Sequence, residues 1–310
     1  MKVSVIIPCF NVENYIEECV HSVINQTYKK IEIICIDNNS KDNTWGKLKE
    51  IKKKHSNLIL EKENTPGANA ARNRGLILST GQWLQFLDAD DIILPKKIEH
   101  QIRLINGKQD VSFIAGSCYK QNIQKDVKEV KPLTNNPFHS LFMGRLGNTC
   151  ANLWCKQCVI AIGGWNEKLQ SSQEADLMFR LLIHNSNIIY DNKFLTLIRE
   201  RPHGQISKID PANNWKRLLH NRLKIFRWVK EELPKVYLQN KDSFDNKLFE
   251  MLKIESKYSL KSSISIYNET LKGNYRPSNY KNHSTKAYII LYQLIGFKYV
   301  ENLRKIIGMK

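Results

Sequence analysis

Residues 83–91 read Trp-Leu-Gln-Phe-Leu-Asp-Ala-Asp-Asp, so that an apolar strand runs directly into three carboxylates. Carboxylates this close repel one another and are costly beside an apolar strand, unless a cation or a hydrogen-bond donor compensates them. A hard divalent cation is the natural partner, because it binds one or two carboxylates and completes its shell with phosphate oxygens. The alternative is a capped turn before Pro95. We favour the cation, so the stretch predicts a metal and phosphate site at the end of a strand.

Short β-branched runs alternate with helical patterns on both sides of this stretch. Apolar strands joined by helical crossovers predict an α/β fold with a mostly parallel sheet, flanked by helices on both faces. Ligands of such sheets bind where the strands end at their carboxyl edge. We expect strands at residues 3–7, 31–36, 58–60, 83–87, 111–119, 188–190 and 195–198, helices at 15–24, 48–54, 68–78, 96–105 and 173–184, and a loop-rich stretch at 121–148.

The other strand ends carry polar residues as well. Residues 8–11, Pro-Cys-Phe-Asn, contain no glycine-rich turn, which excludes a dinucleotide-binding fingerprint, and the chain has no P-loop either. Residues 37–44, Asp-Asn-Asn-Ser-Lys-Asp-Asn-Thr, place short hydrogen-bond acceptors at the expected edge of the crevice. Ser40 and Asp42 have the alternative role of capping the next helix. Asp37, at the strand tip itself, is predicted to contact the ligand.

The composition is that of a folded protein with an anionic partner. Of 310 residues 42% are hydrophobic and 25% are charged, which argues against wholesale disorder. The 48 Lys and Arg exceed the 30 Asp and Glu and give a net charge of +18. This charge favours nucleic acid, a membrane surface or a phosphorylated substrate without distinguishing them.

Cysteine usage and hydropathy predict where the chain works. Seven scattered cysteines suit reduced thiols better than a disulfide framework, and the lone pair Cys155 and Cys158 suits buried thiols better than a metal site. The N-terminal apolar run ends at Pro8 and is too short for a signal peptide. No uncharged apolar stretch approaches the roughly 20 residues that span a bilayer. Cytoplasmic residence is therefore the expectation.

Four segments together resemble a family 2 glycosyltransferase with the GT-A fold. They are residues 3–11, 37–44 and 67–75 and the motif Asp88-Ala-Asp90, all within about the first 95 residues. The resemblance implies a nucleoside-diphosphate sugar donor, expected to be UDP-linked, and Mn²⁺ or Mg²⁺ as cofactor. It implies a catalytic domain over 1–210, with nucleotide-sugar binding over about 1–95 and the acceptor side over about 96–210.

The resemblance also implies roles for individual residues. Asp37 would meet the nucleobase, Arg72 the base or phosphate region, and Asp88 and Asp90 the ribose and the metal-bound diphosphate. Asn38 stands where the family often has a second acid, which leaves the nucleobase contact open. The predicted donor-binding residues are Pro8, Phe10, Asn11, Asp37, Asn38, Ser40, Arg72, Asp88 and Ala89. The predicted metal ligands are Asp90 and His203. The alternative for His203 is an ordinary surface histidine without a ligand.

Residues 173–180 resemble the acceptor-side helix of the family, where an acidic pair usually carries the catalytic base. Gln173 replaces the first acid, so Glu174 is the expected base and Asp176 the second candidate. An inverting transfer needs one such carboxylate to take the proton of the acceptor hydroxyl. The alternative is that Glu174 only favours the N-terminus of its helix electrostatically.

Two other functions fit the sequence less well. A sugar nucleotidyltransferase would need a glycine-rich phosphate loop after the first strand, and residues 8–11 do not form one. A nucleic-acid-binding protein is suggested by the charge alone. Aromatic residues interleaved with the basic stretches would support it, and the basic run 52–54 resembles an ordinary solvated helix face instead. Nucleic acid is therefore not an expected partner.

From about residue 211 to 310 the chain becomes a basic helical region. Its apolar run 287–297 is flanked by lysines and is either a core helix or a segment lying in a membrane interface. On the second interpretation Tyr288, Tyr292 and Tyr299 would lie at the level of the lipid headgroups. The enzyme would then be peripheral on the inner face of the membrane and would extend a glycan or a lipid-linked glycan.

Overall fold

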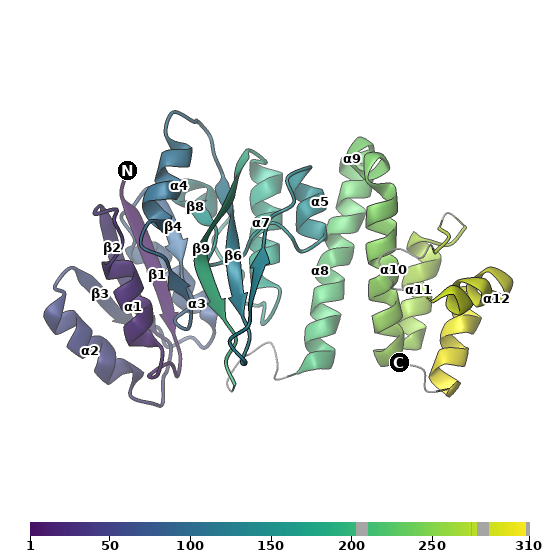
Figure 1. The fold of residues 1–310 in the computed structure, drawn as a ribbon, viewed down its shortest axis with the longest axis horizontal. Coiled ribbons are helices and arrows are strands. Elements are labelled where there is room, and N and C mark those ends of the chain that lie inside the picture. The colour runs from purple at the N-terminus through teal and green to yellow at the C-terminus, as the bar shows by residue number, and fades with distance from the viewer. Residues whose placement is uncertain (203–209, 274, 278–284, 308–310) are drawn as a thin grey trace. The chain divides into compact units, whose positions relative to one another are not determined.

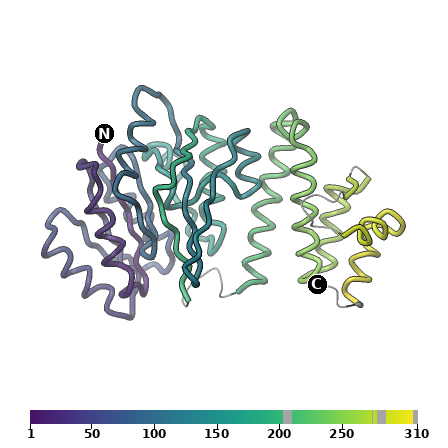
Figure 2. The backbone as a smooth tube through the Cα atoms, viewed as in Figure 1, coloured from purple at the N-terminus to yellow at the C-terminus, as the bar shows by residue number. Residues whose placement is uncertain are grey.

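The computed structural model describes residues 1–202, 210–273, 275–277 and 285–307, and the remaining residues are grey in Figures 1 and 2. The chain divides into two compact units, Met1–Ile209 and Asp210–Lys310. Figure 1 shows a sheet with helices in the first unit and helices alone in the second.

The first unit is built on a sheet with the strand order β3-β2-β1-β4-β8-β6-β9-β5, in which β7 pairs with β6. The half formed by β3, β2, β1 and β4 is parallel, as the sequence predicts. In the other half only β6 and β9 are parallel, and the remaining pairs are antiparallel. The strands are β1 Val3–Cys9, β2 Ile31–Asp37, β3 Leu58–Lys62, β4 Trp83–Phe86, β5 Ile92–Ile93, β6 Phe113–Gln121, β7 Val127–Val130, β8 Leu153–Cys155 and β9 Ile188–Arg199.

Helical crossovers connect the parallel strands and supply much of the core. In α1, Ile16, Cys19, Val20 and Val23 recur at helical spacing and are buried in the same cluster as the alternate residues of β1. Burial of each large apolar side chain contributes about 1.5–3 kcal/mol. The helices of this unit are α1 Ile16–Ile24, α2 Thr44–Lys54, α3 Ala68–Leu78, α4 Lys97–Ile105, α5 Pro137–Phe142, α6 Lys156–Ala161 and α7 Gln173–His184, so that the stretch 121–148 contains α5 and β7.

Helix α3 lies unusually close to the central strand β1. A Cβ atom added to Gly75 would meet Ile6 Cγ2 at 2.3 Å, so only glycine allows this approach. The close contact fixes α3 against the sheet, and Arg72 lies one turn before Gly75 on the same helix. Helix α3 therefore holds Arg72 in a fixed position near the carboxyl ends of the strands.

At the opposite end of the sheet, Glu32 of β2 joins three segments. It accepts hydrogen bonds from Ser4 Oγ, from Thr80 N at 2.6 Å and from Thr80 Oγ1 at 2.7 Å, and it pairs with Lys2 Nζ at 2.6 Å. Burial raises the pKa of Glu32, but the contacts with Lys2, Ser4 and Thr80 outweigh it and lower the pKa to about 2. The ionised carboxylate is therefore the form that stabilises the fold.

Replacing Glu32 by glutamine is expected to lower the free energy of unfolding at pH 7 by about 1–3 kcal/mol, because charged hydrogen bonds are lost. The folded-state pKa lies below the ordinary value, so this contribution is complete above about pH 4.5 and is lost as the pH falls toward 2. Urea unfolding of both proteins at neutral and acidic pH measures the difference between their free energies of unfolding, and this difference should become smaller as the pH is lowered. A difference that stays constant would contradict the role of ionised Glu32.

The second unit is a set of helices around an aromatic core. Tyr288 and Tyr292 are buried beside Phe249, and the Tyr292 hydroxyl is hydrogen-bonded to Tyr267. Of the two interpretations of the run 287–297, the placement of Tyr288 and Tyr292 at lipid headgroups is therefore wrong, and both residues fit the core helix. Within the described residues, no helix has the length and apolar character needed to cross a membrane. The helices are α8 Pro211–Glu232, α9 Pro234–Gln239, α10 Lys241–Tyr258, α11 Leu260–Thr270 and α12 Lys286–Ile307.

Candidate active site

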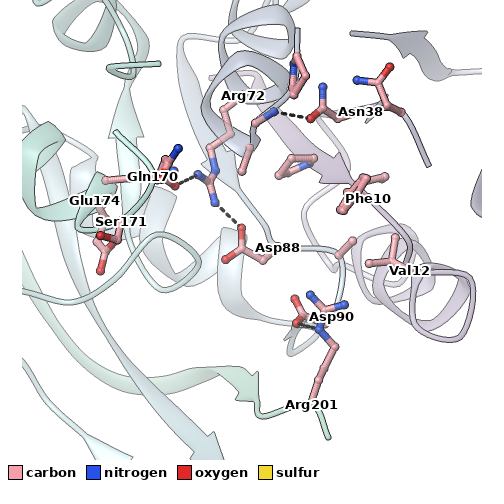
Figure 3. A pocket seen from close by; sticks show the side chains of 18 of the residues that line it. Phe10, Val12, Asn38, Arg72, Asp88, Asp90, Gln170, Ser171, Glu174 and Arg201 are labelled. Carbon is pink, nitrogen blue, oxygen red and sulfur yellow. Dashed lines mark hydrogen bonds and ion pairs between the residues drawn. The ribbon is translucent and has the colours of Figure 1, made fainter. Parts of the chain in front are cut away.

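A cleft of about 840 Å³ opens beside the carboxyl ends of β1, β2 and β4, where the sequence places the ligand. Figure 3 shows side chains from both of its walls. Eight of the predicted site residues line it, namely Pro8, Phe10, Asn38, Arg72, Asp88, Ala89, Asp90 and Glu174.

Arg72 connects the two walls of the cleft. Its guanidinium donates to Asp88 Oδ1 at 2.7 Å on one side, as Figure 3 shows. On the other side it donates to Gln173 Oε1 at 3.0 Å. The group also lies 4.6 Å from the centre of the Trp165 ring, a cation–π contact. Arg72 is only 5% exposed. These contacts and its burial hold the guanidinium in one position beside the cleft and away from bulk water.

Asn69 and Asn73 of α3 form a further set of hydrogen bonds with residues 165–166, before α7; together with the Arg72–Gln173 bond, this set is called the seam. Asn69 Nδ2 donates to the Asn166 carbonyl at 2.7 Å, and Asn73 Nδ2 donates to the Trp165 carbonyl at 2.9 Å. The Trp165 amide donates back to Asn73 Oδ1 at 2.9 Å. These amide hydrogen bonds and the Arg72–Gln173 bond together hold residues 165–173 against α3.

Asp90 is the carboxylate with the least favourable surroundings in the cleft. Burial and the neighbouring Asp88 carboxylate raise the pKa of Asp90, and Arg201, whose Nε lies 2.6 Å from Asp90 Oδ2, opposes this shift. A divalent cation would relieve the remaining repulsion between the two carboxylates. Because both line the cleft, Asp88 and Asp90 fit Mg²⁺ or Mn²⁺ as oxygen ligands.

Asp91 has a structural position rather than a place in the cleft. It accepts a hydrogen bond from the Arg199 amide at 2.9 Å and one from Cys150 Sγ at 3.2 Å. Burial, with the charges of Asp90 and Asp88, raises the pKa of Asp91 well above its ordinary value. Asp88, Asp91 and Cys150 lie close enough together to share an ion. However, burial raises the pKa of the Cys150 thiol, and a protonated thiol is a poor ligand for a hard cation.

Asn38 holds the loop that forms the rim of the cleft. Its Nδ2 donates to the carbonyls of Glu63 and Thr65 at 2.8 and 2.7 Å, and its Oδ1 accepts from the Gly67 amide at 2.7 Å. An aspartate cannot donate to the two carbonyls. The asparagine at this position is thereby explained by the loop it supports, which contributes Asn64, Pro66 and Gly67 to the cleft.

Changing Asn38 to aspartate is expected to lower the free energy of unfolding by about 1–3 kcal/mol, because a carboxylate would face two carbonyl oxygens. The matched control is Asn39→Asp, since Asn39 is exposed and its contacts with the same loop are longer, 3.1 and 3.4 Å. Urea unfolding should show a change of no more than about 0.5 kcal/mol for the control. Equal losses in the two variants would contradict the role of Asn38.

Three predicted donor-binding residues do not line the cleft. Asn11 and Ser40 bond to each other, the Asn11 amide donating to Ser40 Oγ at 3.2 Å, and Asn11 Oδ1 accepts from the Lys41 amide. They connect the loops that follow β1 and β2. Asp37 is 4% exposed, and its Oδ1 has no hydrogen-bond partner in the described part of the chain. Such a buried acceptor is available to a ligand that reaches the tip of β2.

The two candidate bases lie in different surroundings. Glu174, in the first turn of α7, lines the cleft, and its carboxylate makes no hydrogen bond or ion pair with the described residues. Asp176 is 6% exposed, does not line the cleft, and accepts from Arg180 Nε at 2.8 Å. Arg180 also donates to the carbonyls of Ile162 and Gly164, both at 2.8 Å. Asp176 therefore holds Arg180 in place, whereas Glu174 is available to a substrate.

Several lining residues have no role in the sequence-based prediction. Gln170, Ser171 and Ser172 lie in an irregular segment without periodicity, so nothing in the sequence indicates them. Arg201 is different, because it belongs to residues 199–204, which resemble a loop of the family that folds over the diphosphate, and basic side chains near this loop are expected to neutralise that group. His203, the second predicted metal ligand, lies outside the described residues. Cys155 and Cys158 are at the start of α6, do not line the cleft, and burial together with Cys155 raises the pKa of Cys158 to about 12.

Residues 4–160 match the family model described as Glycosyl transferase family 2. The chain is 34% identical over 218 residues to an uncharacterized glycosyltransferase of Rickettsia prowazekii, a match covering 65% of this chain and 64% of that protein. It is 29% identical over 257 residues to one of Rickettsia felis, covering 78% of this chain and 42% of the relative. The chain thus spans less than two thirds of the length of these relatives.

Two solved structures share the fold. The structure of S. aureus TarS 1–349 in complex with UDP-GlcNAc aligns with a TM-score of 0.61 and 14% identity, covering 98% of this chain and 92% of that one. The mannosyltransferase PcManGT from Pyrobaculum calidifontis, in complex with GDP-Man and Mn²⁺, aligns with a TM-score of 0.55 and 13% identity, covering 100% and 88%. The α/β sheet flanked by helices, followed by C-terminal helices, is thus an architecture also found in nucleotide-sugar complexes.

Proposed function

Because the chain belongs to glycosyl transferase family 2, we propose that it transfers a sugar from a nucleoside-diphosphate sugar to a hydroxyl group of a glycan, with inversion at the anomeric carbon. The observation that carries this proposal is the composition of one cleft. It contains the carboxylates of Asp88 and Asp90, the cations Arg72 and Arg201, and the carboxylate of Glu174, which has no partner among the described residues. These are the groups that the reaction requires. The donor is proposed to be UDP-linked, which the UDP-GlcNAc complex of a structural neighbour supports.

The donor half of the cleft is assigned to residues 1–95 and the acceptor half to residues 96–210. The rim loop held by Asn38 is available to the nucleobase, and so is Asp37 Oδ1, which no other described residue contacts by a hydrogen bond. Arg72 and Arg201 place positive charge beside the position of the diphosphate. The proposed acceptor wall comprises residues 170–174, of which Figure 3 labels Gln170, Ser171 and Glu174, and Arg72 contacts it through Gln173.

We assign metal binding to Asp90, with Asp88 beside it and His203 as a further candidate ligand. When bound, Mn²⁺ or Mg²⁺ would stabilise the negative charge of the leaving diphosphate. The Mn²⁺ in the neighbouring mannosyltransferase complex supports this assignment. Burial and the neighbouring Asp88 carboxylate, which together raise the pKa of Asp90, support it from within the cleft.

The proposed reaction is a single displacement. Glu174 takes the proton of the acceptor hydroxyl while that oxygen forms its bond to the anomeric carbon. The bond from the anomeric carbon to the diphosphate oxygen breaks, and the electron pair leaves with the nucleoside diphosphate. Arg72 and Arg201 stabilise the developing charge without moving, because both are already fixed by Asp88 and Asp90.

Thermal-shift measurements with UDP, GDP, CMP and dTDP, each with and without Mn²⁺, test the donor assignment, since a ligand of the folded state raises its apparent stability. UDP with Mn²⁺ should give the largest shift. NMR of the product then tests inversion, because an α-linked donor should give a β-linked product. No shift with any nucleotide would overturn the proposal. The acceptor is proposed to be a growing surface glycan or a lipid-linked glycan at the cytoplasmic face of a membrane.

A further inference from the structure

Helix α12 has one side buried in the helical unit. Tyr288, Tyr292, Phe297 and Val300 are each less than 10% exposed, and they pack with the aromatic core around Phe249. The Tyr288 hydroxyl donates to Glu301 Oε1 at 2.7 Å, which anchors the last turns of the helix. The contacts of this side explain why α12 packs onto its unit. They do not explain the residues on the opposite side of the helix.

The opposite side of α12 is also apolar, although it faces solvent. Leu294 is 74% exposed, Tyr299 59% and Ile306 80%. Gly296, with φ 76° and ψ 169°, divides α12 into two segments, and side chains from both segments line one shallow depression. A surface helix normally shows polar residues on its outer side, and a contiguous exposed apolar patch marks a binding surface. The depression is lined by Leu294, Ile295, Tyr299, Asn302, Leu303 and Ile306.

Positive charge accompanies this apolar face. Residues 210–310 contain 20 Lys and Arg against 9 Asp and Glu, a net charge of +11 out of the +18 of the whole chain. Lys298 and Lys305 are exposed directly beside Tyr299 and Ile306 in the chain, whereas Arg304 is paired with Glu301. A second copy of the same chain would bring two such positive surfaces together, and their repulsion disfavours it.

We propose that the outer face of α12 binds an anionic lipid surface, lying in its plane. Leu294, Tyr299 and Ile306 would enter the boundary between headgroups and acyl chains, and Lys298 and Lys305 would meet the lipid phosphates. This inference deepens the proposed function by naming the surface that carries the acceptor. It differs from the sequence-based expectation, because Tyr288 and Tyr292 face the core and the exposed aliphatic residues take their place.

Flotation of the full chain with phosphatidylcholine vesicles, with and without phosphatidylglycerol, tests the proposal at low and high salt. The chain should float with the anionic vesicles at low salt. Lys298→Gln/Lys305→Gln should lower the partition coefficient about 30-fold, since each cation near an anionic leaflet contributes about fivefold. The matched control is Lys52→Gln/Lys53→Gln, which removes the same charge from two exposed residues of α2 and should change it little.

Leu294→Ser/Ile306→Ser should lower the partition coefficient at least about tenfold, and Ile77→Ser/Leu238→Ser, which alters equally exposed aliphatic residues elsewhere, should not. Melting temperatures should be unchanged in all four variants. The proposal is overturned if the full chain does not float at low salt or if Leu294→Ser/Ile306→Ser floats equally. A third outcome would also overturn the proposal: the full chain does not float, but sediments as a dimer that Leu294→Ser/Ile306→Ser dissociates. That result would assign the outer face of α12 to a second copy of the chain. Because flotation measures binding rather than transfer, failure here is distinguishable from failure of the proposed reaction.

Discussion

Replacing Asp90 by asparagine is expected to reduce sugar transfer by about 10³-fold or more, because loss of a metal ligand removes several kcal/mol of charge stabilisation. The fold should survive. Asp90 pairs with Arg201 alone through its side chain in the described structure, and its own pKa is raised by burial and by Asp88. The neutral amide therefore removes an unfavourable charge, and the melting temperature should not fall. Initial rates at saturating Mn²⁺ and circular dichroism melts measure both effects.

The matched control for Asp90→Asn is Asp242→Asn, which makes the same chemical change at an exposed position of α10 and should leave the rate unchanged. Asp91→Asn should behave differently, since Asp91 accepts bonds from Arg199 and Cys150 and is buried. Its main effect is expected on stability. Full metal-dependent turnover by a well-folded Asp90→Asn protein would remove Asp90 from the metal site.

Replacing Glu174 by glutamine is expected to lower kcat by about 10²- to 10⁴-fold, the usual contribution of a general base. Donor affinity should be preserved, because Glu174 lies on the proposed acceptor wall and the substitution leaves Asp88 and Arg72, the proposed donor contacts, unchanged. The melting temperature should also be unchanged, since the Glu174 carboxylate has no partner among the described residues. Single-turnover rates and calorimetric titration with the nucleoside diphosphate separate these two readouts.

Asp176→Asn is the comparison that distinguishes the two carboxylates of α7. It should cost about 1–3 kcal/mol of stability, because it weakens the ion pair that holds Arg180 against Ile162 and Gly164. The rate of the folded fraction should fall less than in Glu174→Gln. The reverse order, with Asp176→Asn the slower enzyme and Glu174→Gln nearly normal, would make Asp176 the base.

Features with a local cause could be predicted from the sequence. The bounds of α3 and α7 coincide with the predicted helices 68–78 and 173–184, because their periodicity is contained in the segments themselves. The two strands expected at 188–190 and 195–198 are one strand, β9. Polar residues between the two predicted strands interrupt the apolar pattern, so the sequence does not indicate one continuous strand. The strand is continuous because it pairs with β6 on both sides of a register shift.

The remaining features depend on partners far away in the chain. The antiparallel half of the sheet contains strands as short as β5 and β8, and such strands carry too few residues to show a period. Within the motif at residues 88–91, the sequence does not distinguish the carboxylates in the cleft from Asp91, because Asp91 is bound by Arg199, 108 residues later. In the same way, the support that Asn38 gives to the rim loop follows from three contacts that no local pattern records.

The seam between α3 and the acceptor wall has a consequence for altering specificity. The wall is fastened on one side at Trp165 and Asn166, by Asn73 and Asn69, and on the other at Gln173, by Arg72. Glu167 also accepts a hydrogen bond from Asn73 Nδ2 at 2.7 Å, so residues 168–172 span the interval between these two fastenings. Gln170, Ser171 and Ser172 among them line the cleft. A segment of different length or composition could be grafted between these fixed ends without disturbing the carboxylates of the donor half. On the proposed assignment of this wall to the acceptor, exchanging residues 168–172 is expected to change the acceptor preference while the donor site stays intact.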